Sequence, residues 1–129
     1  MFRMKKSFNT DTQCIVKILR YIDDIQAILD NDNVKSFQDL SNSLSAKYAV
    51  TQLLTNVYEL SRKLQDSTLQ SLKGFNSPVL KKARQIASHD YDAIDFRSIY
   101  NLCLNLTGEA VRKELQECLE AIKNANVSD

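Results

Sequence analysis

The sequence predicts an all-α protein in which four amphipathic helices form an antiparallel four-helix bundle. The chain has 129 residues but only two glycines and one proline, so it is poor in the residues that form turns. Apolar residues recur at spacings of three and four over long segments, as they do on one face of a helix. No segment shows the strict alternation of a half-buried strand, and the links between the helical segments are short, which favours antiparallel neighbours.

A single domain accounts for residues 1–129, and its ordered core is expected to span about residues 11–123. A chain of this length buries about two thirds of its unfolded surface, which is enough for one hydrophobic core. The last residues, 124–129, are expected to fray.

The first helix is expected from about Asp11 to Asp30, with Thr10 or Asp11 as its N-cap. The adjacent acids Asp23 and Asp24 lie beside its apolar face and would permit a paired-carboxylate metal site. Neighbours on a helix point about 100° apart, however, which favours a solvated acidic face. The inward residues are expected to be Ile15, Ile18, Leu19, Ile22, Ile25 and Leu29.

Residues 36–40 are expected to form a loop or a single turn, with Phe37 and Leu40 covering the end of the core. A second helix is expected from about Ser43 to Gln65. Its apolar face is broad, as expected for a helix that packs on more than one neighbour. This face is predicted to carry Leu44, Ala46, Val50, Leu53, Leu54, Val57, Leu60 and Leu64.

Residues 66–76 have the composition of an irregular segment. Ser77 and Pro78 then predict a helix start, because serine is a good N-cap and proline suits the first turn. The last helix is expected from about Asp95 to Lys123, and the pair Thr107-Gly108 favours a kink in it. Its inward residues are expected to be Ile99, Leu102, Cys103, Leu106, Ala110, Leu115, Leu119 and Ile122.

The overall charge carries no signature of nucleic-acid binding, because 17 basic residues balance 16 acidic ones. Any contact with RNA would therefore be local. A basic pair at Arg112 and Lys113 is interpreted equally well as ordinary solvated helix charge. The larger basic cluster consists of Lys81, Lys82 and Arg84.

The cysteines predict neither a zinc site nor a disulfide. Cys14, Cys103 and Cys118 are far apart in the sequence, and the chain has one histidine. Because zinc sites need clustered thiolates and imidazoles, we expect no metal and no cofactor, and free thiols in a reducing compartment. The sequence contains no signal-peptide pattern and no membrane-length apolar run, so a cytoplasmic location with no membrane contact is expected.

The stretch from Arg84 to Tyr91 is the part of the sequence that packing does not explain. It contains the only histidine, His89, with Arg84 five residues before it and Tyr91 two residues after it. An imidazole titrates near neutral pH, a guanidinium can hold a phosphate through two hydrogen bonds, and a phenol can accept a transferred group. Together these residue types indicate chemistry on phosphate.

Helical geometry places Lys82 within about 20° of His89, with Gln85 one turn before His89 on the same face. Arg84 and His89 would lie about 140° apart on a continuous helix, so Arg84 flanks this face. A site shared with the tyrosine requires the backbone to leave the helix near Asp90.

Each of these residues also has a structural interpretation. A histidine near a helix end commonly caps the helix or complements its dipole, and a helical arginine is usually solvated. The tyrosine can pack over the start of the last helix with its hydroxyl in water. Residue types and spacing leave both interpretations open.

The pattern R-x-x-x-x-H-x-Y, formed by Arg84, His89 and Tyr91, resembles the signature of the HepT-like family within the HEPN superfamily of helical domains. As in that family, two amphipathic helices precede the motif, and a short acidic link and a long helix follow it. The resemblance covers about residues 11–123 and implies a HEPN-like order of the helices. The sequence departs from the family in having Tyr58-Glu59-Leu60 in place of Gly-Glu-Ala, in having Gln85 in place of Asn, and in lacking the Trp and Gly that usually precede the arginine.

The resemblance implies that Arg84 and His89 are catalytic, and that other polar residues support them. Glu59 would help to orient the motif, although an intrahelical ion pair with Arg62 or Lys63 explains this glutamate equally well. The remaining supporting residues would be Lys82, Gln85 and Asp90.

The function implied by the resemblance is a metal-independent endoribonuclease, the toxin of a toxin–antitoxin pair. Its partner would be a minimal nucleotidyltransferase that transfers an adenylyl group from ATP to Tyr91. Because RNA cleavage through the 2′-hydroxyl uses both a base and an acid, and the chain has one histidine, a homodimer is expected. The alternative, favoured by the nearly neutral charge, is a non-catalytic helical partner or substrate-binding subunit of such a nucleotidyltransferase.

Overall fold

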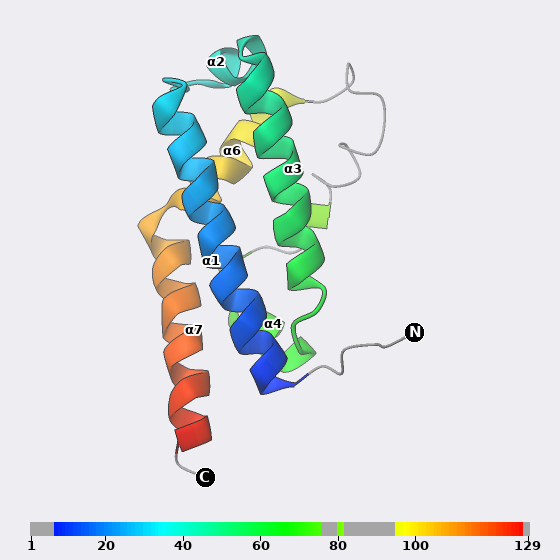
Figure 1. Ribbon diagram of the computed structural model, residues 1–129, viewed down its shortest axis with the longest axis vertical. Coiled ribbons are helices and arrows are strands. Elements are labelled where there is room, and N and C mark those ends of the chain that lie inside the picture. Colours follow the sequence, from blue (N-terminus) through cyan, green and yellow to red (C-terminus); the bar gives the residue numbers. More distant parts are fainter. Residues whose placement is uncertain (1–6, 76–79, 82–94, 128–129) are drawn as a thin grey trace.

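The computed structural model describes residues 7–75, 80–81 and 95–127, and every regular element in these ranges is an α-helix (Figure 1). The all-α prediction is confirmed for this part of the chain. None of the described helices combines the length and the apolar character needed to cross a membrane. The side chains of residues 126 and 127 are outside the description.

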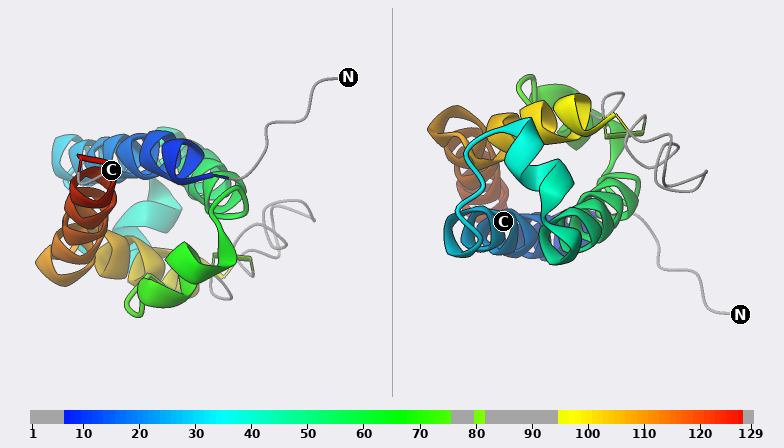
Figure 2. Two further views of the ribbon diagram at one scale, coloured as in Figure 1. Left: turned by 90° about the horizontal axis from the view of Figure 1, so that it is seen from below. Right: turned by 90° about the horizontal axis from the view of Figure 1, so that it is seen from above.

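The helix α1 (Phe8–Asn31) is the element on which the others assemble. It packs against α3 (Leu44–Ser61), α6 (Phe96–Thr107) and α7 (Glu109–Val127). Figures 1 and 2 show α3, α6 and α7 arranged around α1, and all three run in the opposite direction to it. The core between them contains the fully buried residues Ile15, Ile18, Ile22, Ile25, Val50, Val57, Leu106 and Leu115.

The start of α1 differs from the prediction, because Ser7, and neither Thr10 nor Asp11, is the N-cap. The hydroxyl of Ser7 accepts a hydrogen bond from the backbone N–H of Thr10, 3.2 Å away. Thr10 and Asp11 are buried inside the helix. The apolar pattern did not reveal this extra turn because its first residue, Phe8, is exposed.

The end of α1 is fixed by a left-handed residue, Asn33, whose φ is 54°. The N–H of Val34 donates to the carbonyl of Leu29 at 2.8 Å, and the N–H of Asn33 donates to the carbonyl of Asp30 at 3.3 Å. These two bonds and the burial of Val34 and Leu29 form a Schellman motif. Asparagine is one of the few residues that adopt this conformation at low cost.

Residues expected to form a loop or single turn form a short helix, α2 (Phe37–Asn42), of six residues. Its N-cap Ser36 accepts from the N–H of Asp39 at 3.1 Å, and the Asp39 carboxylate accepts from the N–H of Lys35 at 2.9 Å. As predicted, Leu40 is buried in the core.

The second predicted helix corresponds to α3, which begins after the N-cap Ser43 and ends at Ser61, four residues before the expected end at Gln65. Its predicted core residues are largely buried. Leu44 is the exception: the residue is 64% exposed because it occupies the first turn of the helix, beyond the end of the core.

The segment expected to be irregular contains the helix α4 (Asp66–Ser71). The buried carboxylate of Asp11 organises this helix. It accepts hydrogen bonds from the backbone N–H of Gln65 and from the hydroxyl of Thr68. The side chain of Asp11 therefore satisfies donors in the first turn of a helix more than 50 residues later in the chain.

The predicted last helix is two helices, α6 and α7, separated at Gly108, whose ψ of 154° is extended. The side chain of Arg112 donates to the carbonyl of Thr107 at 3.4 Å and pairs with Asp23, so it links the first turn of α7 to α1. The break shifts the helical phase. As a result Ala110, predicted to be inward, is exposed, and Val111 is buried in its place.

The predicted third helix lies mostly outside the described residues, and so does its expected start at Ser77 and Pro78. Leu80 and Lys81 are described, and both are helical. Leu80 is fully buried in the core, while Lys81 is exposed. A helical conformation at this place agrees with the prediction for these two residues.

Candidate functional site

Six of the predicted site residues lie outside the described part of the chain. Their roles stay predictions. The segment that carries them is flanked by two anchored positions, the buried Leu80 before it and Asp95, the N-cap of α6, after it. The six residues are Lys82, Arg84, Gln85, His89, Asp90 and Tyr91.

Asp95 is a firmly held residue at the end of that segment. Its carboxylate accepts from the hydroxyl of Ser98 at 2.8 Å and from the backbone N–H of Arg97 at 3.0 Å. The hydrogen bond from Ser98 is the main cause that lowers the pKa of Asp95 below its ordinary value, and the backbone N–H groups of the cap add to it. Asp95 is therefore a stable negative charge at neutral pH.

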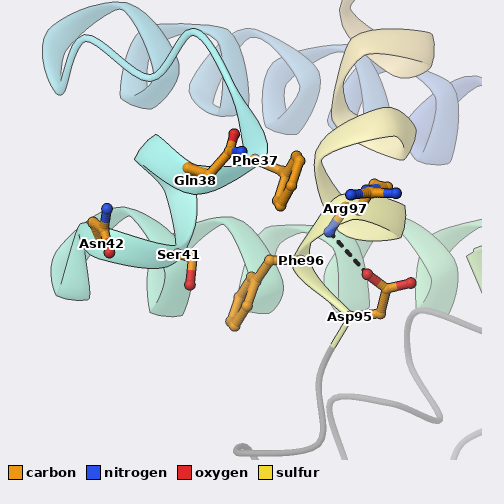
Figure 3. Close-up of a pocket in the computed structure, with 7 residues that line it drawn as sticks. All are labelled: Phe37, Gln38, Ser41, Asn42, Asp95, Phe96 and Arg97. Carbon is orange, nitrogen blue, oxygen red and sulfur yellow. Dashed lines mark hydrogen bonds between the residues drawn. The ribbon is translucent and has the colours of Figure 1, made fainter.

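A cavity of about 390 Å³ opens beside Asp95, between α2 and the start of α6 (Figure 3). Two aromatic rings border it, Phe37 from α2 and Phe96 from α6. Its other lining residues are polar or charged: Gln38, Ser41, Asn42, Asp95 and Arg97.

Each aromatic ring of this cavity carries a cation. The guanidinium carbon of Arg97 lies 4.6 Å from the centroid of the Phe37 ring, and the ammonium nitrogen of Lys47 lies 5.8 Å from that of Phe96. Both distances are within the range of a cation–π interaction. The sequence pattern did not indicate Arg97, and it predicted for Phe37 only a place over the end of the core. The sequence signal available was an aromatic residue at the start of a short polar helix.

Glu59 lies on α3, and its carboxylate is 3.8 Å from the guanidinium of Arg62 one turn later. The intrahelical ion pair that sequence analysis offered for Glu59 is thus confirmed. Both side chains are about half exposed, so the pair contributes little stability. The role of Glu59 in orienting the motif stays a prediction.

The smaller basic pair is engaged with acidic residues. Arg112 pairs with Asp23, and the ammonium of Lys113 lies 3.9 Å from the carboxylate of Glu117. Asp23 is thus an ion-pair partner, as the solvated-face interpretation of the two adjacent acids allows. Within the described ranges no group of three or more His, Cys, Asp and Glu residues is placed to hold a metal ion.

The three cysteines are free thiols, as predicted, and two of them are buried. Burial raises the pKa of Cys103 to about 12. It also raises the pKa of Cys14 and of Cys118, the latter being only partly buried. Since the thiolate is the reactive form, Cys103 is chemically inert at neutral pH.

Comparison of the chain with models of protein families, with curated protein sequences and with solved structures found no match.

Proposed function

We propose that the chain is a HepT-like protein of the HEPN superfamily, a metal-independent endoribonuclease that acts as the toxin of a toxin–antitoxin pair in the cytoplasm. The observation that carries the proposal is the motif of Arg84, His89 and Tyr91 in a short helical chain. The proposed fold is an antiparallel four-helix bundle. α1, α3 and the pair of α6 and α7 supply three of its segments, and the helix containing Leu80 and Lys81 is the proposed fourth.

In the proposed reaction, the 2′-oxygen of one nucleotide attacks the phosphate on its own 3′-oxygen, and the 5′-oxygen of the following nucleotide is the leaving group. His89 takes the proton from the 2′-hydroxyl, the 2′-oxygen forms a bond to phosphorus, and the bond from phosphorus to the 5′-oxygen breaks. A second imidazole, in its protonated form, gives a proton to the leaving 5′-oxygen. Arg84 stabilises the negative charge that develops on the phosphate oxygens, and Glu59, Lys82, Gln85 and Asp90 are supporting residues.

The proposed active form is a homodimer, because the two proton transfers need a base and an acid and each chain has one histidine. A two-fold axis beside the motif would bring together two imidazoles and two guanidiniums. Sedimentation velocity at micromolar concentration is expected to give a dimer. A monomer in an active preparation would refute the shared cleft.

Regulation would be covalent. The phenol oxygen of Tyr91 attacks the α-phosphorus of ATP in the active site of a partner nucleotidyltransferase, and pyrophosphate leaves. The adenylyl phosphate then occupies the place of the RNA phosphate beside Arg84 and His89. Intact-mass analysis after incubation with the partner and ATP is expected to show a mass gain that Tyr91→Phe abolishes. A gain that persists in Tyr91→Phe would place the modification elsewhere.

The activity itself is tested by incubating purified protein with single-stranded RNA in EDTA. The rate of cleavage in EDTA is expected to equal the rate without EDTA. An oligonucleotide with 2′-O-methyl riboses is expected to resist cleavage, because its 2′-oxygen has no proton to lose. Loss of cleavage in EDTA would indicate metal-dependent chemistry. Cleavage of the 2′-O-methyl oligonucleotide would exclude the 2′-oxygen as the nucleophile.

The second candidate is a non-catalytic helical partner or substrate-binding subunit of the nucleotidyltransferase. The observation that favours it is the net charge of +1, which is low for a nucleic-acid enzyme. Co-purification with the nucleotidyltransferase without any RNA cleavage would support this candidate over the first.

A further inference from the structure

The cavity between α2 and α6 combines two aromatic rings with polar side chains. Phe37 and Phe96 offer aromatic faces, and Gln38 and Asn42 are exposed, so their amide groups can hydrogen-bond to a ligand. Figure 3 shows these side chains around one opening, with Ser41 on the same helix as the amides. The cavity volume of about 390 Å³ is within the range of small-molecule sites.

The two rings differ in what holds them. Phe96 packs against the hydrophobic core, whereas Phe37, although half-buried, is outside the core cluster. The ring of Phe37 contacts a cation instead, the guanidinium of Arg97, 4.6 Å from the ring centroid. An aromatic ring kept at the surface under a cation is an ordered platform on which a flat ligand can stack.

The charges around the cavity suit a ligand with a phosphate. Arg97 and Lys47 each lie over one of the two rings. Of these two cations only Arg97 lines the cavity, together with one anionic residue, Asp95. The Asp95 carboxylate is already engaged by the hydroxyl of Ser98 and the N–H of Arg97. A phosphate beside the guanidinium of Arg97 is therefore favoured over one beside Asp95.

We propose that this cavity binds one unpaired nucleobase of single-stranded RNA. The base stacks on Phe37, the amides of Gln38 and Asn42 hydrogen-bond to its edge, and Arg97 contacts an adjacent phosphate. The choice of RNA as the ligand rests on the proposed function.

The test measures binding without cleavage. Fluorescence anisotropy is recorded with a labelled single-stranded oligonucleotide that has 2′-O-methyl riboses, and with its duplex. The variants Phe37→Leu and Arg97→Ala alter the cavity. The control for Phe37→Leu is Phe8→Leu, because Phe8 is also a partly exposed phenylalanine. The control for Arg97→Ala is Arg62→Ala, because the Arg62 guanidinium also lies near an aromatic ring, 5.9 Å from the centroid of Tyr58.

The single strand is expected to bind more tightly than the duplex, and each cavity variant should weaken its binding at least about fivefold, while the controls bind like the wild type. If Phe37→Leu does not fold by circular dichroism, Asn42→Ala replaces it, since Asn42 is exposed. Equal binding by cavity variants and controls, or equal binding of single strand and duplex, would overturn the proposal. This binding assay is independent of the cleavage assay, so the two proposals can fail separately. Binding that depends on Phe37 and Arg97 in a protein that does not cleave RNA would refute the nuclease alone. RNA cleavage together with cavity variants that bind like the wild type would refute the cavity alone.

Discussion

The carboxylate of Asp11 is completely buried and accepts two hydrogen bonds of 3.0 Å from Gln65, one from its backbone N–H and one from its side-chain amide. The hydroxyl of Thr68 donates a third hydrogen bond to the same carboxylate. These bonds tie the first turn of α1 to the first turn of α4. The position of α4 relative to α1 therefore depends on the side chain of Asp11.

Replacement of Asp11 by alanine is expected to lower the free energy of unfolding by about 2 kcal/mol or more, because it leaves donors of Gln65 and Thr68 unpaired near the core. Asp30→Ala is the matched control. Asp30 is exposed on the same helix and accepts one hydrogen bond from Gln26, so its loss should change stability by less than about 0.5 kcal/mol. Urea unfolding measures both. Equal effects of the two substitutions would contradict the proposed role of Asp11.

A second carboxylate, Glu114 of α7, holds the chain just after α4. It accepts from the backbone N–H groups of Gly74 at 3.0 Å and Phe75 at 3.2 Å. Glu114→Gln removes the charge from these bonds, and we expect it to lower the free energy of unfolding by roughly 1 kcal/mol. Glu117→Gln is the control, since Glu117 makes only a long, exposed ion pair with Lys113. A loss of stability in the control as large as in Glu114→Gln would argue against this anchor.

Cysteine reactivity should follow burial. With its pKa raised to about 12, Cys103 has a thiolate fraction on the order of 10⁻⁴ at a pH of about 8, so iodoacetamide should leave it unmodified in the native protein. Cys118 is less buried and is expected to react first. Peptide mass spectrometry after timed alkylation measures the order, and all three thiols should react in denaturant. Rapid native modification of Cys103 would show that α6 is not packed as described.

The pKa of Asp95 is expected to depend on Ser98. Since the hydrogen bond from Ser98 is the largest cause of the lowered pKa, Ser98→Ala should raise it toward the ordinary value of 3.8. A carboxyl whose pKa is lowered by folding stabilises the protein above its unfolded pKa, and this contribution is lost as the pH falls through the folded pKa. Carboxyl ¹³C titration by NMR measures the shift. An unchanged pKa in Ser98→Ala would mean that the backbone N–H groups alone set it.

Local patterns in the sequence predicted the helices, because an apolar residue every third or fourth position reports the buried face directly. The inward face of the first helix was predicted correctly at Ile15, Ile18, Ile22 and Ile25. The pattern could not reveal α4. That helix is ordered by Asp11, and no local feature of residues 66–76 indicates a partner 54 residues earlier.

The break at Gly108 was anticipated only as a kink. Its consequence, the burial of Val111 in place of Ala110, depends on how far the backbone turns at the break, and the sequence pattern does not indicate that angle. The cavity beside Asp95 was also missed. Phe37 and Arg97 are 60 positions apart in the sequence, and only the packing of α2 against α6 brings them together. The motif residues were identified by residue type and spacing alone.

The most direct test of the central claim is the rate of RNA cleavage by the wild type and by His89→Ala, measured in EDTA at equal concentrations of folded protein. A proton-transfer role for His89 predicts a rate at least about 100-fold lower in the variant, with an unchanged circular dichroism spectrum. Arg84→Ala should show a similar loss, whereas Arg20→Ala, a control that alters an exposed arginine of α1, should cleave like the wild type. Equal cleavage by wild type and His89→Ala would contradict the account.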